Sequence, residues 1–275
     1  MKFGIGCFVT DEGIAPGALG RAVEERGFAS LLVAEHSHIP VSRRTPYPAG
    51  GDLPRVYYRA LDPFVALTAA AATTSQLVVG TGIALLAQRD PISTAKEVAS
   101  LDLVSGGRFA FGVGVGWNRE EMENHGTDPT TRGRRMDEYL EAMRRIWTED
   151  QAEFHGEFVN FDPIFSWPKP VQQPHPPIYI GGGEANFGRI ARFGARWLPN
   201  ATSADALAPQ LAKLRDVAGA DVVVAATHIG RQEPEKLAGY AELGVERLTL
   251  NIPTAPEAET LEHLDRIAQL AAKVG

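Results

Sequence analysis

The stretch LGRAVEERGFASLLVAEH, residues 19–36, has the pattern of an amphipathic helix that stops at Gly27 and is followed by a short apolar strand. The same order, with a glycine between helix and strand, recurs in FGRIARFGARWLPN (187–200) and KLAGYAELGVERLTLNIP (236–253). Glycine suits the left-handed position that ends a helix, and the strand then packs back against that helix. Parallel strands need such a crossover helix, so the repeated unit predicts a parallel sheet.

Eight segments have the composition of strands: residues 2–9, 30–36, 77–86, 108–116, 177–182, 195–200, 221–229 and 247–253. Eight strands with helices between them predict an α/β fold, a (β/α)8 TIM barrel. A doubly wound open sheet is the alternative, disfavoured because the first β–α turn lacks the G-x-G-x-x-G fingerprint. Long connections predict insertions after strands 2 and 4, the second with a hairpin around His155. No low-complexity linker interrupts the chain, so one domain is expected over residues 1–275.

Composition and charge exclude several classes of function. The chain has a single cysteine, Cys7, so it cannot form an internal disulfide, which fits a reducing cytoplasm. Its N-terminus makes a poor signal peptide, and its most apolar interior run, FVALTAAAATT, is too short to span a bilayer. The net charge of −7 argues against nucleic acid as a partner. We therefore expect a cytoplasmic protein that acts on a small molecule.

The stretch AEHSHIP, residues 34–40, follows the second strand and holds two histidines. In a barrel the active site lies where the strands end, at their C-terminal face. His36 and His38 could supply half of a zinc site, but a catalytic metal needs about three ligands and only His228 could join them. We therefore expect no metal. Small Ala34 before His36 favours a histidine at the mouth of a pocket, and a packed or capping histidine is the alternative. His38 lies past the end of the strand, so we expect it to be a loop residue.

Two glycine-rich stretches mark further candidates. In FAFGVGVG the large side chains of strand 4 alternate with Ala110, Gly112, Gly114 and Gly116, so one face is nearly bare. Tight packing against a helix and space for a flat ligand explain that face equally well. In IYIGGGEAN, the glycines Gly181, Gly182 and Gly183 precede an expected helix, where backbone N–H groups form an anion seat, provided that Glu184 turns outward. No serine or cysteine nucleophile motif and no glycosidase acid pair is present, which indicates a redox cofactor.

The segment AKEVASLDLVSGGRFAFGVGVGWNREEMENHG, residues 95–126, resembles the signature region of the bacterial-luciferase-like superfamily of flavin- and deazaflavin-dependent enzymes. The resemblance is strongest to its coenzyme F420-dependent oxidoreductases. It continues through residues 62–91, 134–150, 154–164, 168–200 and 243–253, which together with that segment cover most of the chain. It implies a luciferase-like TIM barrel with an insertion region that assembles as a homodimer.

The resemblance also implies roles for particular residues. A non-prolyl cis peptide or bulge behind the cofactor ring falls on Gly82 and Ile83 at the end of strand 3. Residues 35–36 resemble the acid–histidine pair of deazaflavin enzymes, which places His36 beside the reactive edge of the ring. The glycine triplet, Gly181 to Gly183, would hold the cofactor phosphate, and Asn118 would lie near the ring or the substrate.

Two departures from the family pattern bear on the substrate. Sugar-phosphate-oxidising relatives carry a glutamate where this chain has Trp117, and their phosphate-binding lysines have no counterpart here. Together with the Tyr- and Arg-rich loop at 43–59, this predicts a bulkier or more apolar substrate.

The cofactor expected is coenzyme F420, with FMN as the alternative, because the two share the barrel, the phosphate seat and the strand-3 backing. Deazaflavin hydride transfer needs an acid–base group, and histidine suits that role near neutral pH. The resulting hypothesis is hydride transfer between F420 and an organic substrate. Its alternatives are an FMN-dependent monooxygenase, a non-catalytic flavin-binding barrel and a metal-dependent hydrolase.

Overall fold

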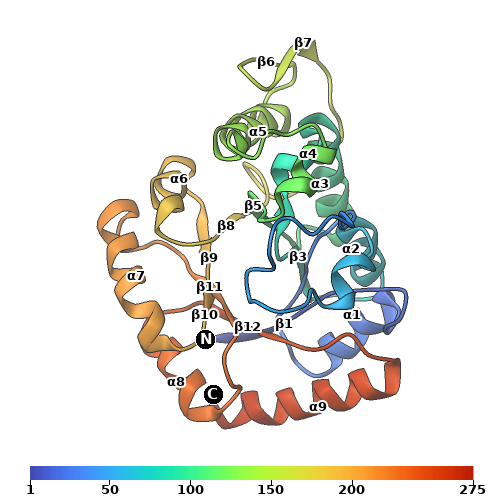
Figure 1. Cartoon of the computed structure of the whole chain (residues 1–275), viewed down its shortest axis with the longest axis vertical. Coiled ribbons are helices and arrows are strands. Elements are labelled where there is room, and N and C mark those ends of the chain that lie inside the picture. Colours follow the sequence, from blue (N-terminus) through green and yellow to red (C-terminus); the bar gives the residue numbers. More distant parts are fainter. Residues whose placement is uncertain (275) are drawn as a thin grey trace.

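Ten short parallel strands form the centre of the computed structural model, which describes residues 1–274 (Figure 1). They are β1 (Lys2–Cys7), β2 (Ser30–Val33), β3 (Val78–Thr81), β4 (Ala84–Leu85), β5 (Phe109–Gly114), β8 (Ile178–Gly181), β9 (Arg196–Leu198), β10 (Asn200–Ala201), β11 (Ala225–His228) and β12 (Arg247–Asn251). Their order is β10-β11-β12-β1-β2-β3-β5-β8-β9, with β4 also paired to β5.

The sheet closes on itself. β9 and β10 are the halves of one strand interrupted at Pro199, which has no N–H to donate. This strand pairs with β8 on one side, while its residues Trp197 and Asn200 pair with Val224 and Thr227 on the other. β3 and β4 are likewise the halves of one strand. The eight strands predicted from the sequence therefore form the expected (β/α)8 barrel.

Helices cover the outside of the strands (Figure 1). They are α1 (Pro16–Glu25), α2 (Pro63–Ala72), α3 (Pro91–Ser105), α4 (Arg119–Asn124), α5 (Arg132–Thr148), α6 (Phe187–Phe193), α7 (Ala204–Ala218), α8 (Pro234–Glu242) and α9 (Glu257–Val274). Three short 3-10 turns are η1 (Arg55–Tyr58), η2 (Leu86–Gln88) and η3 (Glu184–Asn186). Gly27, Gly194 and Gly244, which follow α1, α6 and α8, have φ of 76°, 58° and 77°. They confirm the predicted helix stops.

The buried apolar side chains form two layers. The larger lies between strands and helices and includes Phe109, Phe111 and Val113 of β5. The smaller fills the inside of the barrel with Leu32, Ala110, Tyr179, Leu198 and Ala225, which come from five different strands. Alternation along β5 therefore points its large side chains at the helices and its small ones into the barrel.

The bare face of β5 lies against a neighbouring strand of the barrel. A Cβ on Gly112 would collide with the backbone oxygen of Thr81, and a Cβ on Gly114 would collide with the side chain of Ile83. Both partners belong to the interruption between β3 and β4. Gly112 and Gly114 thus make room for a neighbouring strand that protrudes into the barrel and not for a helix, while space for a flat ligand along this face stays a prediction.

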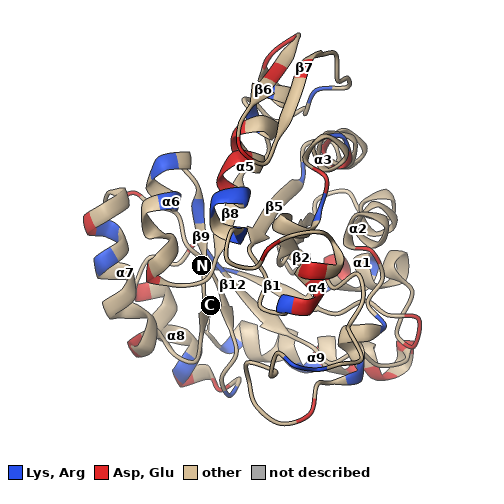
Figure 2. Cartoon of the chain, turned by 45° about the horizontal axis from the view of Figure 1, so that its top comes forward, with Lys and Arg blue, Asp and Glu red and all other residues tan. Residues whose placement is uncertain are grey.

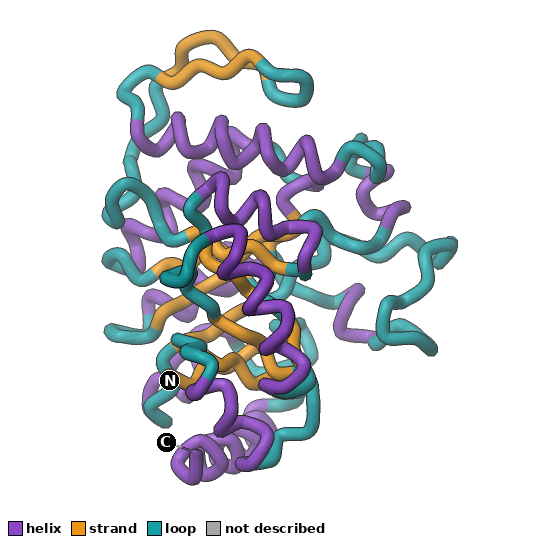
Figure 3. Tube along the Cα trace, turned by 90° about the vertical axis from the view of Figure 1, so that its left-hand side faces the viewer, coloured by secondary structure: helices purple, strands orange, loops and turns teal. Residues whose placement is uncertain are grey.

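Two insertions leave the barrel at its C-terminal face, as expected. Residues 34–62 follow β2 and include η1. After β5 come α4, α5 and an antiparallel hairpin of β6 (Ala152–His155) and β7 (Asn160–Ile164), which confirms the predicted hairpin. Figures 1 and 3 show this hairpin beyond α5, at the end of the molecule farthest from α9.

Figure 2 shows basic and acidic residues interspersed over the outer helices. On α5, Arg134 pairs with Glu157 of the hairpin turn, and Asp137 and Glu141 pair with Arg189 and Arg192 of α6. This helix thus carries a face on which basic and acidic residues are interleaved. None of the helices within residues 1–274 has the length and apolar character needed to cross a bilayer.

Candidate functional site

His36 is buried at the C-terminal end of the second barrel strand and contacts a carboxylate from α4. Its Nδ1 lies 2.8 Å from Oε2 of Glu121, whose side chain is completely buried. A carboxylate accepts hydrogen bonds, so Nδ1 carries the proton and Nε2 is the nitrogen left to exchange a proton with a bound molecule. The other carboxylate oxygen of Glu121 is buried and has no hydrogen-bond partner among the described residues.

Glu35, the acid expected to pair with His36, does not do so. It points to the opposite side of the strand, where it accepts hydrogen bonds from the backbone N–H of Leu85 (2.6 Å) and from Nε of Arg89 (2.7 Å). Its role is to tie the end of β2 to β4 and η2. The acid that contacts His36 is Glu121, which is 85 residues away in the sequence. Only its place in an acidic segment just after a barrel strand could have drawn attention to it.

Four aromatic side chains gather around His36: Phe8, Tyr47, Tyr57 and Trp117, here called the aromatic cluster. The His36 ring lies 5.1 Å from that of Tyr57 and 5.8 Å, edge-on, from that of Trp117, measured between centroids. The hydroxyls of Tyr47 and Tyr57 are 3.2 Å apart. Burial, together with the hydrogen bond between the two hydroxyls, raises the pKa of Tyr57, so its phenol stays neutral. The Tyr-rich loop and Trp117 thus meet around the histidine.

Asn118 follows Trp117 and is buried at the start of α4. Neither Oδ1 nor Nδ2 of its amide has a hydrogen-bond partner within residues 1–274. A buried polar group without a partner costs about 1–3 kcal/mol, so such groups in native proteins normally meet a ligand or water. A ligand that presents both a donor and an acceptor would satisfy this side chain.

Gly82 and Ile83 lie at the interruption of the third barrel strand, and the peptide bond between them is cis. The Ile83 side chain reaches over the glycines of the next strands: a Cβ on Gly181 would lie 3.3 Å from its Cγ2. The cis bond expected from the resemblance is therefore present, and it brings Ile83 and the start of the glycine triplet together. The contact of these residues with a cofactor stays a prediction.

The glycine triplet forms a tight turn with φ of 93° at Gly182. The carbonyl oxygens of Gly181 and Gly182 accept hydrogen bonds from Asn186 Nδ2 (2.8 Å) and Trp197 Nε1 (2.7 Å). The expected helix start at Glu184 is wrong by three residues, because η3 intervenes and α6 begins at Phe187. Glu184 turns outward to Lys213, 2.7 Å away, and so leaves the turn free of its charge. The phosphate-binding role of Gly181, Gly182 and Gly183 stays a prediction.

The other histidines of the zinc hypothesis are engaged elsewhere. His38 lies in the loop, where the Ser37 hydroxyl stands between its Nδ1 (2.9 Å) and Nε2 of His125 (2.8 Å). His228 is buried, with Nδ1 3.0 Å from the Tyr240 hydroxyl. In the part of the chain that the structure describes, no three His, Cys, Asp or Glu side chains converge to hold a metal ion.

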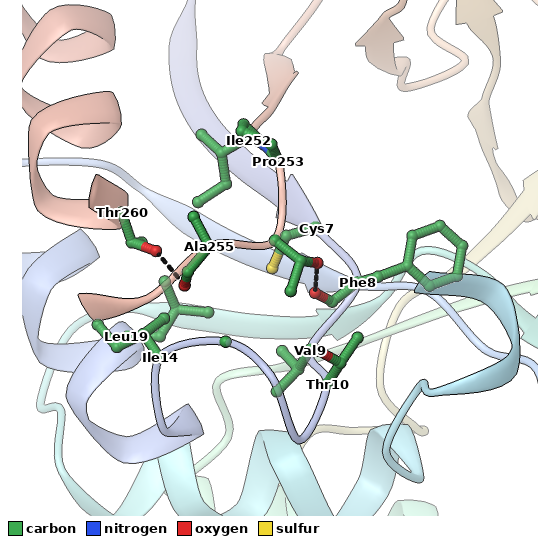
Figure 4. Close-up of a pocket in the computed structure, with 12 residues that line it drawn as sticks. Cys7, Phe8, Val9, Thr10, Ile14, Leu19, Ile252, Pro253, Ala255 and Thr260 are labelled. Carbon is green, nitrogen blue, oxygen red and sulfur yellow. Dashed lines mark hydrogen bonds between the residues drawn. The ribbon is translucent and has the colours of Figure 1, made fainter. Parts of the chain in front are cut away.

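Two cavities adjoin these residues. One of about 330 Å³ borders His36 and is lined further by Glu35, Ser37, Ala60, Asp62, Pro63, Gln88, Arg89 and His125. The other, of about 10 Å³, lies between the ends of β1 and β12 and has room for about one water. Figure 4 shows its apolar lining, with the Phe8 ring turned away from it. Burial raises the pKa of Cys7 in this lining to about 12, so its thiol stays protonated.

Comparisons with known proteins agree with this architecture. The family model described as luciferase-like monooxygenase matches residues 16–274. An uncharacterized protein of Mycobacterium tuberculosis is 42% identical over 278 residues, 98% of each chain. The FMNH2-dependent dimethylsulfone monooxygenase of Pseudomonas putida is 34% identical over 135 residues, 48% of this chain and 37% of that protein.

Among solved structures, an F420-dependent secondary alcohol dehydrogenase in complex with an F420–acetone adduct has the same fold. It matches with a TM-score of 0.76 and 18% identity over the whole length of both chains. The chain belongs to the luciferase-like monooxygenase family, whose fold serves both F420-dependent and flavin-dependent oxidoreductases.

Proposed function

We propose that this protein is a coenzyme F420-dependent oxidoreductase that transfers a hydride between the deazaflavin and an organic substrate other than a sugar phosphate. The observation that carries the proposal is the buried His36–Glu121 pair at the C-terminal face of the barrel. A histidine backed by a carboxylate is suited to move a proton, and proton transfer must accompany hydride transfer to or from an alcohol or carbonyl group. The full-length structural match to an F420-dependent alcohol dehydrogenase supports the same cofactor.

The residues at the barrel mouth fit a deazaflavin or flavin. Asn118 offers an unpartnered amide donor and acceptor, which match the hydrogen-bonding edge of such a ring system. Gly82 and Ile83 provide an apolar backing. The turn at Gly182 and Gly183, cleared of the Glu184 charge, suits the phosphate. When bound, the cofactor supplies hydride chemistry that no protein side chain can supply.

The protein's own part is binding and proton transfer. Nε2 of His36 takes the proton from a substrate hydroxyl in the oxidative direction or gives one to a carbonyl oxygen in the reductive direction. Glu121 fixes the ring with its proton on Nδ1 and stabilises the imidazolium that forms during transfer. The aromatic cluster covers the histidine and excludes water from the reacting groups.

Trp117 carries the argument against sugar phosphates. It stands beside His36, and its large apolar surface takes the place of hydrogen-bonding groups that a sugar would need. We infer a substrate with an apolar or aromatic body.

An FMN-dependent monooxygenase is the second candidate. It is favoured by the 34% identity to an FMNH2-dependent monooxygenase, although that match spans only half of this chain. In this case the aromatic cluster would shield the reduced flavin from solvent, and activity would require oxygen.

Parallel fluorescence titrations of the purified protein with coenzyme F420 and with FMN separate these candidates. Micromolar binding of F420 without comparable binding of FMN is the result expected. A preference for FMN would move the protein to the monooxygenase branch, with substrate-dependent oxygen consumption as the next assay. Binding of neither cofactor would contradict both candidates.

A further inference from the structure

Arg43 differs from the other arginines of the loop after β2. Arg44 pairs with Glu123 (3.0 Å), Arg55 with Glu12 (2.6 Å) and Arg59 with Asp11, Nε to Oδ1 2.8 Å. Arg43 has no carboxylate partner within residues 1–274, and its Nη1 is buried without any hydrogen bond. Burying a guanidinium nitrogen unpaired is costly, so this side chain lacks the anion that each neighbouring arginine has.

The backbone directs Arg43 away from the contacts of its neighbours. Ser42 and Arg44 on either side both engage acids of α4, whereas the Arg43 guanidinium lies 5.8 Å from the centroid of the Trp117 ring. Arg43 has φ of 48°, the one positive value at a non-glycine residue between Met1 and Val274. Such a conformation is disfavoured for a residue with a side chain and concentrates at binding sites.

The surroundings of this guanidinium include the aromatic cluster and, through Trp117, the histidine of the proposed proton transfer. The Trp117 ring neighbours both groups, with the Arg43 guanidinium 5.8 Å from its centroid and the His36 ring in edge-on contact with it. Tyr47 lies 6.0 Å from the same tryptophan ring. A flat molecule of one or two rings held along Trp117 would place one end at the guanidinium and the other near Nε2 of His36.

The charge balance favours a monoanion. The planar guanidinium fork matches a carboxylate. Glu120 and Glu123 belong to α4, where Thr45 binds Glu120 and Arg44 binds Glu123. Their negative charges would repel the second charge of a phosphate dianion.

We propose that Arg43 binds the carboxylate of an aromatic substrate whose ring packs against Trp117 and whose opposite end reacts beside His36. This inference rests on the proposed function, because it names the substrate class of that site. A purely structural role for Arg43, as a brace on the tryptophan ring, predicts no preference between charged and neutral ligands.

Binding of 2-naphthoate and of its neutral analogue 2-naphthamide, measured by equilibrium dialysis against the full-length protein, distinguishes the two roles. Each probe is tested with and without F420 or FMN. We expect the wild type to bind naphthoate about tenfold more tightly or better, since a hydrogen bond to a charged group contributes about that much. Arg43→Gln should abolish this preference, while Arg43→Lys, which keeps the charge but not the planar fork, should retain part of it.

Arg44→Gln is the matched control, because Arg44 is adjacent, exposed and already paired with Glu123. It should keep the full preference for naphthoate. Equal binding of the two probes, no naphthoate binding at millimolar concentration, or an unchanged preference in Arg43→Gln would each overturn the proposal.

Titration of the same variants with F420 and FMN keeps the two proposals separable. Arg43→Gln should bind cofactor as the wild type does. Cofactor binding without a preference for naphthoate would remove the carboxylate site and leave the proposed function. If the protein binds neither cofactor but still prefers naphthoate through Arg43, the carboxylate site would stand and the proposed function would fall.

Discussion

At the scale of single residues, His36 is the group on which the proposed chemistry depends. Replacing it with alanine removes the proton donor and should lower kcat by about 10²–10⁴-fold, the usual loss for an acid–base residue. Cofactor affinity should stay close to that of the wild type. His38→Ala is the control, since that ring lies in the loop with Ser37. Steady-state kinetics on both variants measure the effect, and equal losses would show that position 36 has no special role.

Glu121 offers a finer test because it acts on the substrate only through His36. Glu121→Gln keeps an oxygen that can accept from Nδ1 of the histidine but loses the charge, whereas Glu121→Leu loses both. We therefore expect kcat to fall in the order wild type, Gln, Leu, with the Michaelis constant for the cofactor little changed. Similar kcat values for the two variants, or losses confined to the Michaelis constants, would remove Glu121 from the proton-transfer step.

The distance between these residues along the chain explains what the sequence could predict. His36 was recognisable because the small residue before it and its place after a strand are local features. Its partner Glu121 was not, since the two residues are 85 positions apart in the sequence and β3, β4, β5, α2 and α3 lie between them. Arg43 was visible only as one of several loop arginines, because its lack of a partner is a property of the folded structure.

At the scale of elements, the glycines of β5 show how one strand depends on its neighbour. Their pattern was plain in the sequence, but its cause, the protrusion between β3 and β4, was not. Gly112→Ala should destabilise the protein by about 1–3 kcal/mol, because the new Cβ meets the backbone of Thr81. The new Cβ of Gly114→Ala meets only the flexible end of Ile83, so this variant should lose less stability. Because it displaces Ile83, the proposed backing of the cofactor, it should weaken cofactor binding.

Urea unfolding and cofactor titration measure these two effects. Gly188→Ala in α6 is the control, because a Cβ there meets nothing within 4 Å and removes a helix glycine. A smaller loss of stability for Gly112→Ala than for Gly114→Ala would contradict this account of the strand.

The loop after β2 is docked on α4 largely through Glu120. Burial alone would raise the pKa of this carboxyl, but hydrogen bonds from the hydroxyl and N–H of Thr45 lower it to about 2. A lowered pKa means that the contribution to stability is present above the ordinary value of 4.5 and is lost as the pH falls from 4.5 towards 2. Thr45→Val should therefore lower the urea midpoint at pH 7, with a difference from the wild type that shrinks in this acid range.

Thr148→Val at the end of α5 is the comparison variant, because that hydroxyl bonds a backbone carbonyl and no carboxylate. Its effect should not change between pH 7 and pH 3. A pH-independent loss of stability in Thr45→Val would show that Glu120 does not hold the loop.

At the scale of the whole molecule, one outer face carries unusually many exposed apolar side chains. It combines the end of α3 with the segment after β7 and consists of Leu103, Val104, Phe165, Trp167 and Val171, with Phe165 72% exposed. The two elements are held together by a hydrogen bond from Lys96 of α3 to the Trp167 carbonyl and by one from the Gln172 N–H to Asp102 (2.9 Å). A patch of this kind on a folded protein indicates an interaction surface.

We expect this face to form the homodimer implied by the resemblance. Light scattering after size exclusion should give twice the chain mass for the wild type. The double variant Phe165→Asp/Trp167→Glu should give the single mass, because two charges cannot be buried unpaired at an interface. Val217→Asp, on exposed α7 across the barrel (Figure 1), should leave the dimer intact. A monomeric wild type at micromolar concentration, or a dimer that survives the double change, would exclude this face as the interface.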